Sequence, residues 1–320
     1  MSAPAVIARP STGSECDVAT TAAAVDAATG QRHRRAVADF IELTKPRVVT
    51  MVLVTTLVGF YLGSSGTPDW WLLGATLIGT GLAAGGTLAL NQYIERDADA
   101  QMDRTRGRPL PTGRLEPLDA LLFGAIVTAL GLLVLMLFAN PLSGLVTATT
   151  VVTYLGLYTP MKRTTPLCGV VGAVPGALPP VTGWVAAHGG FGAGAWVLFA
   201  ILFLWQLPHS LAIAQLYATD YARAGFRLLP IVDRDGHSTE RQIVVNCIAL
   251  LAVGLAPTLL GVAGSLYFAV ALVLGTAFLG CGIAAAVRPS TAAARRVMFA
   301  SLLYLPALLA CMAFDKVPLG

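Results

Sequence analysis

One short stretch of the chain concentrates side chains that could do chemistry. Residues 91–114 contain four carboxylates and five arginines, directly after a long apolar run. Four oxygen-bearing side chains in this stretch are spaced four residues apart: Asn91, Glu95, Asp99 and Asp103. Because a helix turns by about 100° per residue, this spacing predicts one stripe of oxygens along a helix that continues to Gly107. Stacked carboxylates repel each other, and such oxygen ligands suit Mg²⁺, which proteins hold with one or two carboxylates and substrate phosphates.

A second polar cluster lies in residues 204–232, "LWQLPHSLAIAQLYATDYARAGFRLLPIV". Asp220 lies near the end of an apolar stretch, and His209 lies inside that stretch, directly after Pro208. Two roles are open for His209: a ligand or proton acceptor, or a hydrogen bond that closes the kink produced by Pro208. For the acidic stripe, the alternative to a metal site is a solvated helix end whose carboxylates pair with nearby arginines.

Basic side chains accompany both clusters. Lys162 and Arg163 lie in a short loop between them, and Arg104 and Arg108 follow the acidic stripe. The candidate metal ligands are Asn91, Glu95, Asp99, Asp103 and Asp220. Together with the four basic residues they predict a diphosphate site, in which a metal and basic groups neutralise the charge that develops on a leaving group. No GxxxxGK[ST] phosphate loop occurs, which argues against a nucleotide-driven machine.

The elements that position these residues are predicted to be membrane helices. The chain of 320 residues is 56% hydrophobic and only 12% charged, with a mean hydropathy of +0.72. A soluble domain carries about 25% charged residues. Apolar segments of about 20 residues, the length that crosses a bilayer, divide the chain into nine spans. These spans are 47–64, 70–91, 118–138, 142–160, 166–186, 194–215, 243–261, 264–286 and 297–314.

The distribution of charge predicts how these spans are oriented. With a cytoplasmic N-terminus, 20 of the 21 Lys and Arg residues fall on the cytoplasmic side, and only Lys316 falls outside. Cytoplasmic loops are enriched in Lys and Arg, so we expect this orientation, with both polar clusters at the cytoplasmic face. Residues 1–38 are predicted to be a disordered cytoplasmic tail before a membrane domain at 39–320. The five cysteines have neither metal-ligand nor disulfide spacing.

Four motifs of the chain resemble those of the UbiA-type intramembrane prenyltransferases. They are "NQYIERDADAQMDRTRGRPLPTG", "YTPMKR", "GALPPVTGW" and "LWQLPHSLAIAQLYATDYARAG", and the resemblance extends from about Leu43 through the ninth span. It implies an all-α membrane protein in which nine transmembrane helices form a bundle around a central cavity, with a cytoplasmic N-terminus. The acidic segments would cap this cavity on the cytoplasmic side.

Within that family the chain resembles the branch that modifies haem. This implies transfer of a farnesyl group from farnesyl diphosphate to the 2-vinyl group of haem B, with Mg²⁺ as the cofactor, at the cell inner membrane. A contact with a haem A synthase, and no nucleic-acid partner, is expected. The first family motif falls on Asn91, Glu95 and Asp99, followed by Arg104 and Arg108. The second falls on Asp220 and Tyr221, preceded by His209. Relatives that act on quinone precursors carry a paired DxxxD in the second motif, whereas position 224 here is Ala.

Two other functions remain open at this point. An aromatic quinone precursor could replace haem as the prenyl acceptor. A transporter is a further alternative, because polar breaks at equivalent places in two four-helix blocks could mark repeats around a central site. Against the transporter, the charged residues gather at one surface rather than at mid-membrane.

Overall fold

The computed structural model describes residues 36–233 and 235–318, and these residues contain nine helices long and apolar enough to cross a membrane. Most of the predicted tail, residues 1–35, lies outside the described residues, and residues 36–43 are helical. The nine spans are α2 (Pro46–Gly63), α3 (Trp70–Asp99), α4 (Pro117–Val134) with η1 (Leu135–Ala139), α5 (Pro141–Val152) with η2 (Thr153–Tyr158) and α6 (Thr159–Met161), α7 (Cys168–His188), α8 (Ala193–Leu216), α11 (His237–Leu259), α12 (Ser265–Val287) and α13 (Thr291–Phe314). Two short helices, α9 (Ala218–Arg223) and α10 (Leu229–Val232), lie between α8 and α11. The prediction of nine spans is confirmed for the described part of the chain.

Local sequence explains where several of these helices begin and end. Pro46, Pro117 and Pro141 occupy the first turns of α2, α4 and α5, where a missing N–H group costs nothing. Asp69 caps α3 by accepting hydrogen bonds from two backbone N–H groups of its first turn. Helix α7 ends at Gly189, whose φ of 82° is a left-handed conformation that glycine adopts freely.

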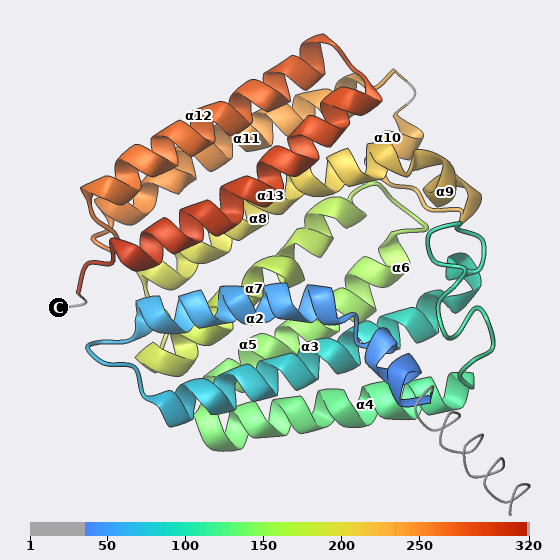
Figure 1. Ribbon diagram of the computed structural model, residues 1–320, viewed down its shortest axis with the longest axis horizontal. Helices are drawn as coiled ribbons and strands as arrows, with labels where there is room; N and C mark the ends of the chain where they lie inside the picture. Colours follow the sequence, from blue (N-terminus) through green and yellow to red (C-terminus); the bar gives the residue numbers. More distant parts are fainter. Residues whose placement is uncertain (1–35, 234, 319–320) are drawn as a thin grey trace, which may run out of the picture.

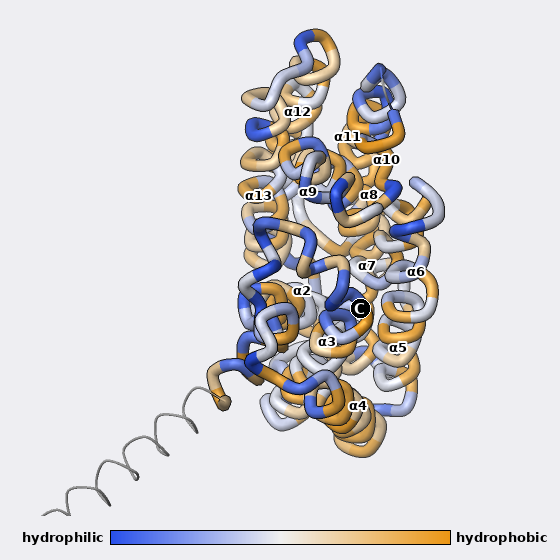
Figure 2. Tube along the Cα trace, turned by 90° about the vertical axis from the view of Figure 1, so that its right-hand side faces the viewer, coloured by the Kyte–Doolittle hydropathy of each residue, from blue (hydrophilic) through white to orange (hydrophobic). Residues whose placement is uncertain are grey.

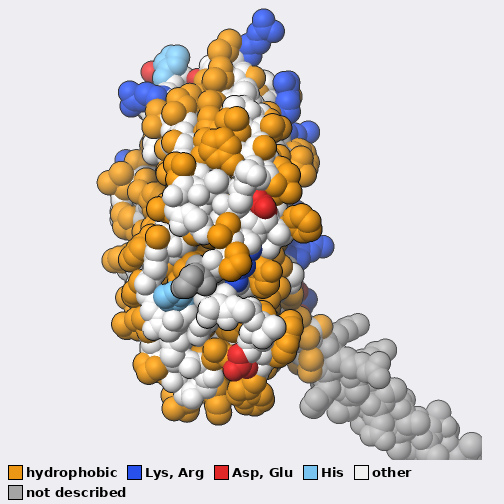
Figure 3. Space-filling view, turned by 90° about the vertical axis from the view of Figure 1, so that its left-hand side faces the viewer, with side chains coloured by type: hydrophobic (Ala, Val, Ile, Leu, Met, Phe, Trp, Pro, Cys, Tyr) orange, Lys and Arg blue, Asp and Glu red, His pale blue; other side chains and the backbone are white. Residues whose placement is uncertain are grey.

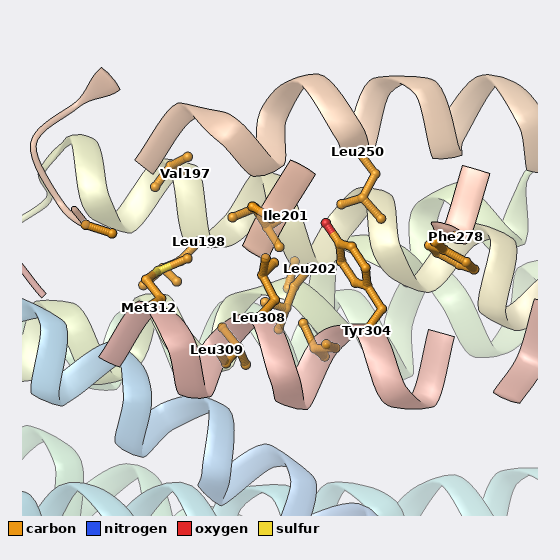
Figure 4. Close-up of a cluster of buried hydrophobic side chains, with 14 of the residues drawn as sticks. Val197, Leu198, Ile201, Leu202, Leu250, Phe278, Tyr304, Leu308, Leu309 and Met312 are labelled. Carbon is orange, nitrogen blue, oxygen red and sulfur yellow. The ribbon is translucent and has the colours of Figure 1, made fainter. Parts of the chain in front are cut away.

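The helices form two groups that lie side by side (Figure 1). One group contains α8, α11, α12 and α13, and its members pack on one another. The other contains α2, α3, α4, α5 and α7, and α7 joins the groups because it packs against both α2 and α8. Figure 4 shows the apolar core of the first group, where Leu198 and Ile201 of α8 lie near Leu250 of α11 and Leu308 of α13.

Small residues let α2 and α7 approach each other closely. A Cβ atom added at Gly59 would collide with the backbone of Pro180, and one added at Gly183 would collide with the backbone of Thr56. Close approach of this kind is how membrane helices gain packing energy without a hydrophobic driving force between them. The contact fixes α2 beside α7, so both helices can line the same interior space.

The two ends of the bundle differ in polarity. Hydrophilic loops gather at the end that carries α6, α9 and α10 (Figure 2). Hydrophobic and uncharged side chains make up most of the visible surface at the opposite end (Figure 3). Lys316, the basic residue predicted to lie apart from the others, is at that opposite end, where it donates hydrogen bonds to the carbonyls of Tyr61 and Ser64. The candidate site residues must therefore be sought at the hydrophilic end.

Candidate active site

A polar cavity of about 690 Å³ lies at the hydrophilic end of the bundle. It is lined by the first turn of α2, the last three turns of α3, the segment that follows α3, η2, and residues between 221 and 228. Of the predicted site residues, six line this cavity: Asn91, Glu95, Asp99, Arg104, Arg108 and Lys162. Four do not line it: Asp103, Arg163, His209 and Asp220.

The three oxygen-bearing residues on α3 are buried, and each contacts a basic side chain from another segment. Lys45 Nζ donates to Asn91 Oδ1 at 3.2 Å. Lys162 Nζ lies 2.8 Å from Glu95 Oε1, and an Arg108 nitrogen lies 2.6 Å from Asp99 Oδ2. The repulsion expected between Glu95 and Asp99 is therefore offset, because each of these carboxylates is paired with a cation.

The predicted oxygen stripe ends one position early. Helix α3 ends at Asp99, not near Gly107, because the chain turns there and Thr105 Oγ1 donates to the carbonyl of Asp99 at 2.8 Å. Asp103 consequently leaves the stripe, and its side chain is 54% exposed. It pairs with Arg223 at 3.0 Å, and this hydrogen bond lowers the pKa of Asp103.

Arg223 and Tyr221 connect the two acidic segments, as the sequence predicted for clusters at one end of the bundle. Arg223 also lies 3.6 Å from buried Asp220, so one guanidinium group joins both motifs. Tyr221 accepts a hydrogen bond from Arg104 at 3.3 Å and lines the cavity in place of its neighbour Asp220. The two predicted clusters thus form one site.

Position 224, where relatives in other branches carry a second carboxylate, is apolar for a structural reason. Ala224 is buried in a small cluster with Ala98, Met102 and Phe226. A carboxylate there would lose its solvation without gaining a partner from this apolar cluster. The single Asp in the second motif is therefore consistent with how the two motifs pack together.

The basic residues near the cavity have different environments. Burial alone would lower the pKa of Lys162, but the charge and hydrogen bond of Glu95, together with the nearby Tyr154 and Tyr221, offset it, so this pKa lies above its ordinary value. The ammonium group also lies 4.5 Å from the centre of the Tyr158 ring. Arg163, by contrast, is exposed to solvent on the loop after α6. Lys162 therefore lines the cavity, whereas Arg163 does not.

Lys45 is a cavity residue that the sequence analysis missed. It precedes α2, and burial, together with the nearby charges of Arg108 and Lys162, lowers its pKa to about 7. The signal available in the sequence was a lysine directly before Pro46 at the start of the first span. Tyr154 and Tyr158 of η2 also line the cavity, and the sequence analysis missed them because nothing in the sequence placed them beside α3.

A second, apolar cavity of about 680 Å³ lies deeper between the helices. It is enclosed by α2, α3, α5, η2, α7, α8 and α13, and it shares Val48, Tyr154 and Tyr158 with the polar cavity. The two spaces therefore adjoin. Together they suit an amphiphilic molecule with an anionic head and an apolar tail, because charged groups line the outer space and apolar groups line the inner one.

His209 lies beside the apolar cavity rather than the polar one. Its Nδ1 is 2.7 Å from Ser301 Oγ of α13, and its ring stacks on Trp205 at a centroid distance of 5.0 Å. Trp205 lines the apolar cavity and donates to the carbonyl of Ser301 at 2.8 Å. His209 therefore bonds to a neighbouring helix and does not close the kink at Pro208, which was one of its two expected roles.

The donor set of the polar cavity fits a hard divalent cation only in combination with an anion. Within residues 36–233 and 235–318, no three His, Cys, Asp or Glu side chains converge on one point. Asn91, Glu95 and Asp99 supply oxygens along one helix face, and Mg²⁺ is commonly held by one or two carboxylates plus phosphate oxygens. The basic residues around them could bind such phosphates.

Comparison with known proteins gives consistent results. The UbiA prenyltransferase family model matches residues 52–303. The protoheme IX farnesyltransferase of Solibacter usitatus is 49% identical and covers 87% of this chain and 98% of its own length. The protoheme IX farnesyltransferase of Koribacter versatilis is 44% identical, with coverage of 87% and 93%.

Solved structures share the fold. A digeranylgeranylglyceryl phosphate synthase has a TM-score of 0.75 at 16% identity, and the match covers 88% of this chain and 99% of that one. A UbiA homologue from Archaeoglobus fulgidus, bound to GPP and Mg²⁺, has a TM-score of 0.61 at 16% identity, with coverage of 86% and 99%. At such identities the likeness establishes the arrangement of the helices.

The ion pair between Glu95 and Lys162 can be tested by a double-mutant cycle. Lys162→Met leaves Glu95 with an unpaired charge, which should lower the free energy of unfolding by about 3 kcal/mol. The double variant Glu95→Gln/Lys162→Met removes both charges and should be more stable than either single variant. Thermal unfolding in detergent measures these effects.

The control for this cycle is Asp97→Asn, which removes a carboxylate from an exposed pair with Arg96 and should leave the melting temperature unchanged. Strict additivity of the two single changes, with no recovery in the double variant, would mean that Glu95 and Lys162 are not coupled.

Proposed function

Because the chain belongs to the UbiA prenyltransferase family, we propose that it transfers the farnesyl group of farnesyl diphosphate to the 2-vinyl group of haem B. The product is haem O, and diphosphate is released. The observation that carries this proposal is the pair of adjoining cavities, one polar and one apolar, which matches a donor with a diphosphate head and a farnesyl tail. The identity of 49% to a protoheme IX farnesyltransferase supports haem B as the acceptor.

The chemistry breaks the C1–O bond of the donor, the π bond of the vinyl group and one O–H bond of water, and it forms one C–C bond and one C–O bond while a base accepts the proton. The bond between C1 of the farnesyl group and the diphosphate oxygen breaks, and C1 bonds to the terminal carbon of the vinyl group. The resulting cation is captured by water, which loses a proton and leaves a hydroxyl group on the other vinyl carbon. The enzyme must therefore stabilise a departing anion at one end of the reacting centre and accept a proton at the other.

The polar cavity supplies groups for the departing diphosphate. We assign its phosphate oxygens to Arg104, Arg108 and Lys162, which line the cavity. Mg²⁺, as found in the Archaeoglobus fulgidus homologue, would be held by Asn91, Glu95 and Asp99. When bound, it neutralises phosphate oxygens as negative charge develops on them.

Residues outside the cavity wall have supporting roles in this proposal. Asp103 and Asp220 share Arg223 and so hold the segment after α3 against α9. Arg163, exposed beside Lys162, adds positive charge at the entrance and attracts the anionic donor. These three residues act on the diphosphate from a distance rather than by contact.

His209 is proposed to act on the acceptor. The hydroxyl of Ser301 donates to the carbonyl of Met298 at 2.6 Å, so Nδ1 of His209 must carry the proton that bonds to Ser301 Oγ. This tautomer leaves a lone pair on Nε2, which can ligate haem iron or accept the proton lost by water. The stacked rings of Trp205 and His209 offer a flat surface for a porphyrin.

The proposed location is the cell inner membrane, with the polar cavity open to the cytoplasm. Hydrophilic loops lie at the end of the bundle that carries α6, α9 and α10 (Figure 2), where Arg108, Lys162 and Arg223 form ion pairs, and this supports the orientation. Labelling of an engineered cysteine on the exposed loop at Arg163, from one side of sealed vesicles, tests it. The hydroxyethylfarnesyl product is the substrate class of a haem A synthase, so we infer a contact with that enzyme, which co-purification from cross-linked membranes would detect.

A transfer assay tests the proposed function. Purified protein given radiolabelled farnesyl diphosphate should label haem B and leave 4-hydroxybenzoate unlabelled. Chelation of divalent cations should abolish labelling, and added Mg²⁺ should restore it. Labelling of hydroxybenzoate instead of haem B would assign the protein to quinone biosynthesis.

A separate measurement tests the role of His209. His209→Ala should weaken haem B binding by about tenfold or more, as judged by absorption titration, while farnesyl diphosphate binding is retained. Lost turnover with both affinities intact would assign the proton-accepting role. Ser301→Ala keeps the imidazole and is the matched control, with a smaller effect expected. Equal loss of both affinities together with a lowered melting temperature would contradict any role on the acceptor.

A further inference from the structure

Lys45 has an unusual backbone conformation. Its φ and ψ are 50° and 67°, and it is the only residue other than glycine with a positive φ in residues 36–233 and 235–318. L-residues with a side chain avoid this left-handed region because Cβ approaches the following carbonyl. Such outliers persist when the surrounding structure enforces them, and they cluster at functional sites.

Three further preferences are broken at the same residue. Lys45 precedes Pro46, and residues before proline favour extended conformations. It is the N-cap of α2, yet it makes no side-chain capping hydrogen bond, unlike the short polar residues preferred there. Its positive charge also lies at the positive end of the helix dipole. Several local costs at one position indicate that this lysine serves something other than the stability of α2.

The surroundings of Lys45 hold it in place. Leu43, two residues earlier, is fully buried, and its carbonyl accepts a hydrogen bond from Gln92 Nε2 at 2.8 Å. The backbone N–H of Lys45 donates to the carbonyl of Glu42 at 3.1 Å. These hydrogen bonds fix the turn before α2 against α3, and the side chain of Lys45 lines the polar cavity.

Lys45 differs from Lys162 and Arg108 in the partner of its charged group. Lys162 and Arg108 are each paired with a carboxylate. Within the described residues, Lys45 Nζ bonds only to the neutral amide oxygen of Asn91. A partly buried cation with no anionic partner is costly unless a ligand supplies one. Five basic side chains against three carboxylates line the cavity, so its net charge also favours an anion.

We propose that Lys45, at the start of α2, binds the diphosphate of the prenyl donor. The proposal rests on the proposed function and adds a binding residue to it. Pro46, Arg47 and Val48 of the first turn of α2 line the same cavity, and the Arg47 side chain adds a further positive charge to its lining. The diphosphate would then be held from the α2 side as well as by the residues around α3.

The strain at Lys45 makes the test unusually specific. Asn tolerates the left-handed region and is a preferred N-cap, so Lys45→Asn removes the ammonium and relieves the local costs at once. We expect the melting temperature to rise by about 2 °C. The KM for farnesyl diphosphate and the inhibition constant of inorganic diphosphate should both rise by about tenfold, the loss of one charge-assisted contact. A residue that only supports the fold would lose stability on replacement.

Two variants and the wild-type protein complete the experiment. Lys45→Arg keeps the charge and should retain most of the diphosphate affinity. Arg288→Ala removes an exposed charge after α12 and should leave both constants unchanged. Unaltered diphosphate inhibition in Lys45→Asn, or a lowered melting temperature with equal loss of diphosphate and haem B binding, would overturn the inference. Failure of wild-type protein to bind diphosphate would overturn the proposed function as well.

Discussion

The buried ion pair between Glu95 and Lys162 is the interaction on which the hydrophilic end of the molecule depends. It fastens α3 to the loop after α6, and the carbonyl of the same lysine accepts a hydrogen bond from Arg227 N at 2.7 Å. One residue therefore holds three segments around the polar cavity. A buried pair of this kind contributes little net stability, because desolvation offsets most of the attraction. Its value is that it positions a cation and a carboxylate where an anion and a metal can use them.

Helix α3 explains how the polar cavity can adjoin the apolar one. Helix α3 continues from the apolar cavity, where it contributes Thr80 and Thr87, to the polar cavity, where it contributes Glu95 and Asp99. Along a helix the eight residues from Thr87 to Glu95 span about 12 Å. A single rigid element thus sets the distance between the head and tail of a bound prenyl diphosphate.

Much of this arrangement could be predicted from the sequence, and the rest depends on tertiary contacts. The length of the apolar segments and the segregation of Lys and Arg were sufficient to predict the nine spans. The four-residue spacing was sufficient to predict that Asn91, Glu95 and Asp99 lie along one face of a helix, where all three line the polar cavity. The end of α3 could not be predicted, because no Gly or Pro precedes residue 107 and the turn is made by Thr105. The contribution of Lys45 was equally hidden, since its conformation depends on how residues before α2 pack on α3.

We infer that one amphiphilic donor occupies both cavities at once, with its diphosphate among the side chains around Glu95 and its tail between the helices. A structure determined with a non-hydrolysable farnesyl diphosphate analogue and Mg²⁺ tests this most directly. We expect phosphate oxygens within hydrogen-bond distance of Lys162 and Arg108, and the farnesyl chain in contact with Thr87. Density for the analogue outside the bundle, or a diphosphate bound away from α3, would contradict it.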